Sequence, residues 1–153
     1  MDRRGSEQIQ VKGFLIVRLV SPAYIRERRI ANLLMNASLS RFVRALTGED
    51  LGDKFIAVGS GKTPPNPTDI KLEDERGRKV ATETAQTGSL EMRAVWSPSE
   101  LVGVDISEAG VFWDGASPLP DSGILMCRSL LENLGVKTNS EILEIIWLWE
   151  FWK

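Results

Sequence analysis

The chain has 153 residues, 42% of them hydrophobic, and its 19 basic residues nearly balance its 21 acidic ones. That length and apolar content suit one compact domain with its own core, and the even charge gives no general nucleic-acid signal. The absence of histidine excludes Ser/His/Asp and Cys/His catalysis and every imidazole metal site. The single cysteine, Cys127, excludes an intrachain disulfide and reads as a small buried hydrophobe. We expect no cofactor.

Residues 1–13 are polar and charged and offer little to bury, so we predict a flexible N-terminal arm followed by one β-rich domain over residues 14–153. Arg3 and Arg4 on this arm are candidate contacts for a neighbouring protein. The first strand is predicted from Phe14 to Val20, where Ser21 and Pro22 close it.

A basic cluster follows at residues 23–29. Its members, Arg26, Arg28 and Arg29, either contact an acidic neighbour or line a solvated connection, which is how most charge runs behave.

One helix is predicted next, because Leu39, Phe42, Val43 and Leu46 stand at the i, i+3, i+4, i+7 spacing of a single helical face. Ser38 is a candidate N-cap and Gly48 follows the end. Packing this face across a sheet would put Arg41 and Arg44 on the outer side.

From Phe55 onward, short apolar stretches alternate with glycine- and proline-containing turns. Strands at this spacing indicate a mainly β fold, an antiparallel β-sandwich or barrel-like sheet with one short amphipathic helix. The expected strands are Phe55–Val58, Lys79–Thr84, Leu90–Trp96, Val111–Trp113, Ile124–Leu131 and Ile142–Trp152.

The apolar runs at residues 13–20 and 142–152 do not predict a membrane partner. Both are shorter than the roughly 20 residues that a bilayer requires. Arg18 interrupts the first, and Glu144 and Glu150 interrupt the second.

The segment Ser60-Gly-Lys-Thr63 ends like a phosphate-binding loop, which would indicate a nucleotide enzyme. That motif requires a glycine at position 56, where this chain has Ile56. Prolines at 64, 65 and 67 also oppose the helix that must follow. We therefore favour a strand that leaves its sheet at Gly59 and Gly61 through a tight or positive-φ turn stiffened by Pro64 and Pro65.

Two acidic groupings could support carboxylate chemistry, but such runs more often mark loops. In the second, Glu108 and Gly110 form a turn before an apolar strand. There the carboxylate either receives backbone or arginine hydrogen bonds that hold the corner or stays unpartnered at the surface. The groupings are Asp69, Glu73, Asp74 and Glu75, and Asp105 and Glu108.

The last strand is apolar on both faces. Trp147, Trp149 and Phe151 point one way, and Trp152 points the other way with Leu148. Burying both faces requires either a partner surface, which favours aromatic anchors, or a central place in the chain's own core.

The order of several segments resembles bacteriophage tail-collar fibre proteins and related virion structural domains. The resemblance covers roughly residues 30–153, and the long receptor-reaching regions of true fibres are missing. After the helix, the matching segments are Phe55-Ile-Ala-Val-Gly-Ser-Gly61, residues 65–76, Arg78-Lys-Val80, Ile106-Ser-Glu-Ala-Gly-Val-Phe112, Ile124-Leu-Met-Cys-Arg128 and Trp149-Glu-Phe151.

The resemblance implies a non-enzymatic virion protein, synthesised in the host cytoplasm, that forms a homo-oligomer such as a trimer and docks to other virion proteins. A tail, collar or fibre-attachment component is the first expectation, and a capsid decoration protein that stabilises the head is the alternative. Nucleotide binding through the degenerate loop is the remote one. Contact with a host receptor is left open.

Overall fold

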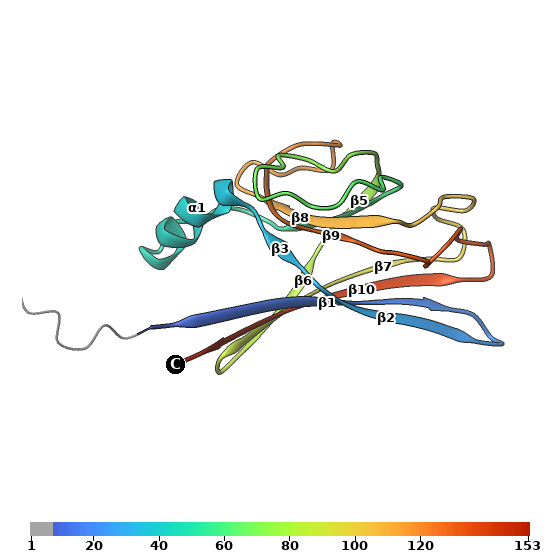
Figure 1. Ribbon diagram of the computed structural model, residues 1–153, viewed down its shortest axis with the longest axis horizontal. Helices are drawn as coiled ribbons and strands as arrows, with labels where there is room; N and C mark the ends of the chain where they lie inside the picture. The colour runs from blue at the N-terminus through green and yellow to red at the C-terminus, as the bar shows by residue number, and fades with distance from the viewer. Residues whose placement is uncertain (1–7) are drawn as a thin grey trace, which may run out of the picture.

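The computed structural model describes residues 8–153 as a β-sandwich of two antiparallel five-stranded sheets with one short helix (Figure 1). This confirms the predicted fold class. The first sheet has the order β2-β1-β10-β7-β6, and the second has the order β3-β9-β8-β4-β5. The elements are β1 (Gln10–Val20), β2 (Ile25–Ala31), β3 (Leu33–Leu34), α1 (Asn36–Leu46), β4 (Phe55–Gly59), β5 (Glu75–Val80), β6 (Thr82–Gln86), β7 (Ser89–Trp96), β8 (Glu108–Trp113), β9 (Ile124–Leu130) and β10 (Ile142–Trp152).

The first and last strands form the centre of the first sheet. β1 and β10 pair along their whole length, from Gln10 opposite Trp152 to Val20 opposite Ile142. Because side chains alternate between faces, one row of each strand fills the space between the sheets. The central side chains of these rows are fully buried: Leu15, Val17 and Leu19 on β1, and Leu143, Ile145 and Trp147 on β10.

A second, smaller core lies on the outer face of the other sheet. Two long loops, residues 60–74 and 114–123, cross over β8 and β5 in Figure 1. Leu72 of the first loop packs into a buried cluster with Ala57, Phe112 and Leu125, and Ala116 of the second loop packs against it. The loops therefore act as a lid of fixed shape over this sheet.

Three boundaries differ from the prediction. Residues 10–13 do not belong to a flexible arm, because β1 begins at Gln10 and pairs with β10 there, whereas residues 1–7 lie outside the described residues. The segment with the basic cluster is mostly a strand, β2, rather than a solvated connection. The single strand predicted at residues 79–84 is the end of β5 and the start of β6, which lie in different sheets. Ala81 makes the crossing, and its N–H donates to the carbonyl of Lys54.

Helix α1 has the predicted apolar stripe, but the stripe faces solvent. Leu39, Val43 and Leu46 are 54%, 63% and 88% exposed. Of the stripe only Phe42 packs inward, with its ring 4.8 Å from Trp113 and 6.2 Å from Trp149 between ring centroids. The expectation that this face packs across a sheet is wrong for the other three residues.

The inner face of α1 is instead polar. Arg41 and Arg44 both reach Asp114 at 3.1 Å, which corrects the expectation that they lie on the outer side. Ser38 is not the N-cap, since Met35 holds that position. Ser38 is buried, and its hydroxyl accepts a hydrogen bond from the indole N–H of Trp113 at 3.1 Å. These polar contacts act together with the packing of Phe42 on Trp113 and Trp149 to hold the inner side of the helix.

Candidate functional site

The loop of residues 60–74, which contains the phosphate-loop-like sequence, is anchored by one buried carboxylate. Glu108 stands at the start of β8 on the outer face of its sheet and is fully buried. Its Oε1 accepts hydrogen bonds from the backbone N–H groups of Gly61 at 2.9 Å and Asp74 at 2.7 Å. Its Oε2 accepts one from the N–H of Glu73 at 3.1 Å. The carboxylate thus joins both ends of the loop, which is the first of its two expected outcomes. The prediction that Glu108 and Gly110 form a turn is wrong, because both lie within β8.

Arg128 on the neighbouring strand β9 completes this arrangement. Its Nε donates to Oε2 of Glu108 at 2.9 Å, and the guanidinium continues outward to the carboxylate of Asp69 at 3.1 Å. Its remaining nitrogen donates to the carbonyl of Thr63 at 2.8 Å. We call Glu108, Arg128 and the loop groups that they bind the loop clamp. Every partner is charged or a backbone dipole, so the buried charges are compensated.

The glycines of the predicted turn allow this close approach. A Cβ on Gly59 would lie 2.3 Å from the carbonyl oxygen of Asp74, and a Cβ on Gly61 would lie 2.5 Å from Oε1 of Glu108. Neither glycine has a positive φ angle. These positions therefore require glycine because a larger side chain would not fit, and not because of the backbone conformation. On β8, a Cβ on Gly110 would lie 2.9 Å from Leu72 and from the carbonyl of Cys127.

Pro64 and Pro65 lie on the outer part of the loop, directly after the carbonyl that Arg128 binds. They lead into a turn in which the N–H of Asp69 donates to the carbonyl of Asn66 at 2.9 Å. The predicted role of these prolines, stiffening the exit from the strand, agrees with that position.

The groups that would hold a phosphate are engaged within the chain. The N–H of Gly61 binds Glu108, and that of Thr63 binds the carboxylate of Glu73 at 3.1 Å. Lys62 pairs with Asp105 at 2.8 Å. Backbone N–H groups that a phosphate loop would direct at its ligand therefore donate to carboxylates of this chain. The segment then continues as turns instead of a helix. This geometry does not favour nucleotide binding.

A second buried ion pair secures the neighbouring loop. Arg78 and Glu75 on β5 pair at 2.7 Å with both side chains 2% exposed. Arg78 also donates to the carbonyls of Ser117 at 3.1 Å and Ser122 at 3.0 Å, and its guanidinium lies 4.4 Å from the ring centre of Phe112. The acidic groupings thus serve to fix loops.

Arg26 and Arg28 differ in how they are used. Arg26 pairs with the fully buried Glu141 at 2.7 Å and donates to the carbonyl of Leu134 at the same distance. Burial alone would raise the pKa of Glu141, but hydrogen bonds from Arg26, Thr138 and Tyr24 lower it to about 2. Arg28 donates to the carbonyl of Glu27 on its own strand.

Arg29 lies on the outer face of the first sheet, 4.0 Å from the ring centre of Phe14. Its side chain therefore covers the ring of Phe14 and keeps it from water, while the charged group stays at the surface of the sheet. Arg3 and Arg4 lie outside the described residues, so their predicted contacts stay predictions.

The aromatic residues of β10 divide into two groups. Trp147 and Trp149 are 0% and 3% exposed, because β10 is central in its sheet and these indoles point into the core. The prediction that they anchor a partner is corrected, because both side chains lie in the chain's own core, as the alternative expected. Phe151 and Trp152 are 38% and 42% exposed beyond the core and stay interface candidates.

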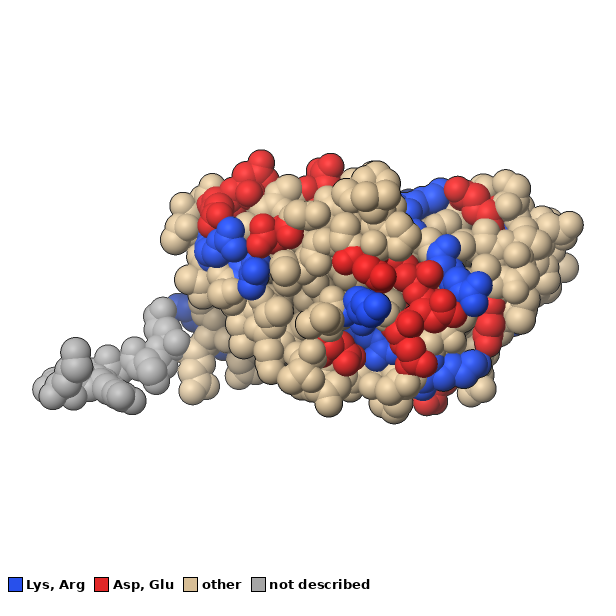
Figure 2. Space-filling view, turned by 90° about the horizontal axis from the view of Figure 1, so that it is seen from above, with Lys and Arg blue, Asp and Glu red and all other residues tan. Residues whose placement is uncertain are grey.

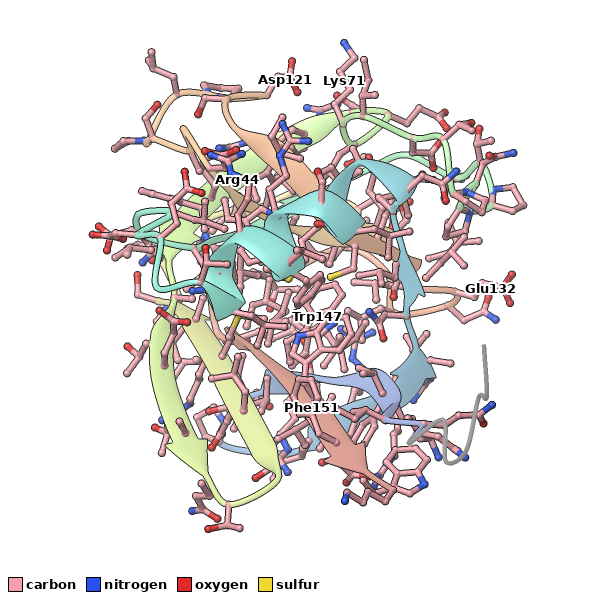
Figure 3. The ribbon with its side chains drawn as sticks, turned by 90° about the vertical axis from the view of Figure 1, so that its left-hand side faces the viewer. Arg44, Lys71, Asp121, Glu132, Trp147 and Phe151 are labelled. Carbon is pink, nitrogen blue, oxygen red and sulfur yellow. The ribbon has the colours of Figure 1, made fainter. Side chains whose placement is uncertain are left out.

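These two residues lie at the same end of the sandwich as α1. Figure 1 shows α1, the start of β1 and the end of β10 together at its left-hand side, and Figure 3 shows α1 and Phe151 facing the viewer on that side. We call this surface the apolar end. The elements that meet there, with the residue just before β1, carry seven hydrophobic side chains that are more than a third exposed, of which Trp152 points to the opposite face of β10 from Phe151. The seven are Ile9, Val11, Leu39, Val43, Leu46, Phe151 and Trp152.

The sequence reasoning identified Phe151 and Trp152 but missed the rest of the apolar end. The stripe on α1 was visible and was assigned to the core. Val11 could have been found from the alternation of β1, because it continues the row of Gly13 and Leu15 toward the N-terminus.

Outside the apolar end, other large hydrophobic side chains are also exposed, among them Ile25, Ile70 and Leu119. Acidic and basic side chains are interspersed on the face seen in Figure 2, so this face presents no field of one sign. Among residues 8–153, no group of three or more potential metal ligands is found, and no helix there is long and apolar enough to cross a membrane.

No protein-family model, curated protein or solved structure matches the chain.

Proposed function

We propose that the chain is a non-enzymatic bacteriophage structural protein, a tail, collar or fibre-attachment component that acts by oligomerising and docking to neighbouring virion proteins. The proposal draws on the resemblance of the segments at residues 55–61, 65–76, 106–112 and 124–128 to virion domains. These segments come from two separate parts of the chain, residues 55–76 and 106–128, and meet at the loop clamp.

One observation carries the proposal. The polar groups of the clamp are engaged with one another, whereas the apolar end leaves seven large hydrophobic side chains in water. Exposed apolar surface on a rigid fold suits assembly with another protein. Catalysis would instead require polar groups that are free to act on a reacting atom, and those of the clamp are bound to one another.

The test is to locate the chain in purified phage particles. We expect it to sediment with intact particles, to resist a salt wash, and to carry antibody label at the tail or collar. Label over the head, together with loss of heat resistance in particles that lack the chain, would instead identify the decoration role. Absence from particles contradicts both.

A nucleotide titration tests the remaining alternative. We expect no ATP or GTP binding by calorimetry, and Lys62→Ala should behave as the unchanged chain does. Saturable binding that this substitution abolishes would contradict a purely structural role.

A further inference from the structure

We infer that the apolar end is the surface on which a second copy of this chain docks. The inference rests on the proposed function, and it names both the partner and the contact. It draws on the size of the patch, the pairing of the charges around it, and an open strand edge within it.

The size of the patch suits a stable interface. With roughly 150–250 Å² for a large side chain, seven such residues, each at least 38% exposed, leave on the order of 700 Å² uncovered. One partner contributes about 800 Å² to a standard interface. The exposed apolar area at this end therefore approaches the share that one partner contributes to a standard interface.

The charges around the patch suit a copy of the same surface. Arg44 pairs with Glu49 at 2.6 Å, and Lys12 stands directly opposite Glu150 in the register of β1 and β10. When a surface meets its own copy across a two-fold axis, the same set of charges stands on both sides of the interface. Because these charges are paired within each chain, two copies do not repel each other strongly. The same pairing gives little electrostatic attraction for a partner that carries a large net charge.

An open strand edge lies within the same end. β1 pairs with β10 from Gln10 onward, but its pairing with β2 begins only at Phe14, opposite Ala31. Over the described residues, the segment 10–12 therefore has a free edge on the side of β2. The same segment of a second copy, running antiparallel across a two-fold axis, can pair with it and bring two copies of Val11 together.

Residues 1–7 do not suit the patch. Their sequence, Met1-Asp-Arg-Arg-Gly-Ser-Glu7, has one apolar side chain among four charged ones. Such a segment cannot replace the seven hydrophobic side chains of the apolar end by burying comparable area.

Light scattering after size-exclusion chromatography of the full chain tests the inference. We expect a mass that is a multiple of 17.0 kDa. The variant Val43→Lys/Leu46→Lys should elute as a monomer, with at least tenfold weaker association. The matched control Ile70→Lys, 73% exposed on the loop of residues 60–74, should associate as the unchanged chain does. At protein concentrations too low for association, circular dichroism should show the same thermal midpoint for all three, because the substituted side chains then lie in solvent.

A labelled variant gives an independent readout. Cys127 is buried, and burial raises the pKa of its thiol, so a dye reacts selectively with Leu46→Cys. An environment-sensitive dye there should shift to shorter wavelength as the protein concentration rises. A chain that stays monomeric, or lysine variants that associate normally, would overturn the inference.

Failure of this inference and failure of the proposed function give different results. A chain that is monomeric in solution but present on particles leaves the virion role standing, with another virion protein on the apolar end. An oligomer that depends on Val43 and Leu46 but is absent from particles supports self-docking and contradicts the virion role.

Discussion

At the scale of single residues, Glu108 has the most demanding environment in the described chain. Its carboxylate is fully buried and receives three backbone N–H groups and a guanidinium. A buried ion pair often adds little net stability, because removing both charges from water costs nearly as much as their attraction returns. Breaking such a pair is expensive, since the remaining charge stays buried alone.

We therefore predict that Glu108→Gln destabilises the protein by about 3 kcal/mol. The amide keeps the shape of the side chain but leaves the guanidinium of Arg128 without its buried counter-charge and presents donors to backbone donors. Urea unfolding measures the change. Asp105→Asn is the control, because it disrupts the mostly exposed pair with Lys62, for which we expect less than about 1 kcal/mol. Equal losses would contradict the role of the clamp.

At the scale of elements, the sequence located α1 and β10 well because both have strong periodic patterns. β10 has the predicted bounds, Ile142–Trp152. The sequence could not show which face of α1 packs on the sandwich, because an apolar stripe of this kind normally marks the packed face. The opposite orientation depends on Asp114, which is 70 residues from Arg44. The crossing at Ala81 was missed for a similar reason, since alternation does not reveal a change of sheet.

Truncation of two adjacent residues of α1 should change the free energy of unfolding by very different amounts. Phe42→Ala removes a ring that packs on Trp113 and Trp149. We expect a loss of about 2–3 kcal/mol, at or below the lower end of the range for fully buried aromatic residues, because Phe42 is only partly buried. Val43→Ala removes an exposed side chain and improves helix propensity, so we expect a change within about 0.5 kcal/mol. Thermal and urea unfolding at low protein concentration should separate them. A larger loss for Val43→Ala would mean that the stripe packs inward.

At the scale of the whole molecule, the sequence was sufficient for the fold class. The alternation of short apolar runs and turns predicted a mainly β sandwich, which the two sheets confirm. The candidate site was predicted only in part. The hydrogen bonds of Glu108 were expected as one of two outcomes, but the partner Arg128 is a contact between strands that spacing does not reveal. The sequence also could not show that Trp147 is buried, because this follows from the central place of β10 in its sheet.

The stability of the sandwich should fall in acid, and Glu141 should account for part of the fall. Its pKa is lowered in the folded state from 4.5 to about 2, so its contribution is complete above about pH 4.5 and is lost as the pH falls through about 2. The shift corresponds to up to about 3 kcal/mol. We expect the urea midpoint of Glu141→Gln to change less with pH over this window than that of the unchanged chain.

Glu132→Gln is the control for that titration, because Glu132 is exposed at the surface. Its pH profile should follow that of the unchanged chain. If Glu141→Gln shows the same acid dependence as this control, the hydrogen bonds from Arg26 and Tyr24 do not hold the carboxylate in its charged form.

The pairing of β1 with β10 also constrains the order of events during synthesis. β1 is made long before β10, which is one of its two neighbours in the sheet. Its apolar row, including Leu15 and Val17, therefore waits for residues 142–152 to leave the ribosome before the core can close. A ribosome stalled before residues 142–152 emerge should hold a chain that proteases cut readily, and a stall after they have emerged should hold a resistant one.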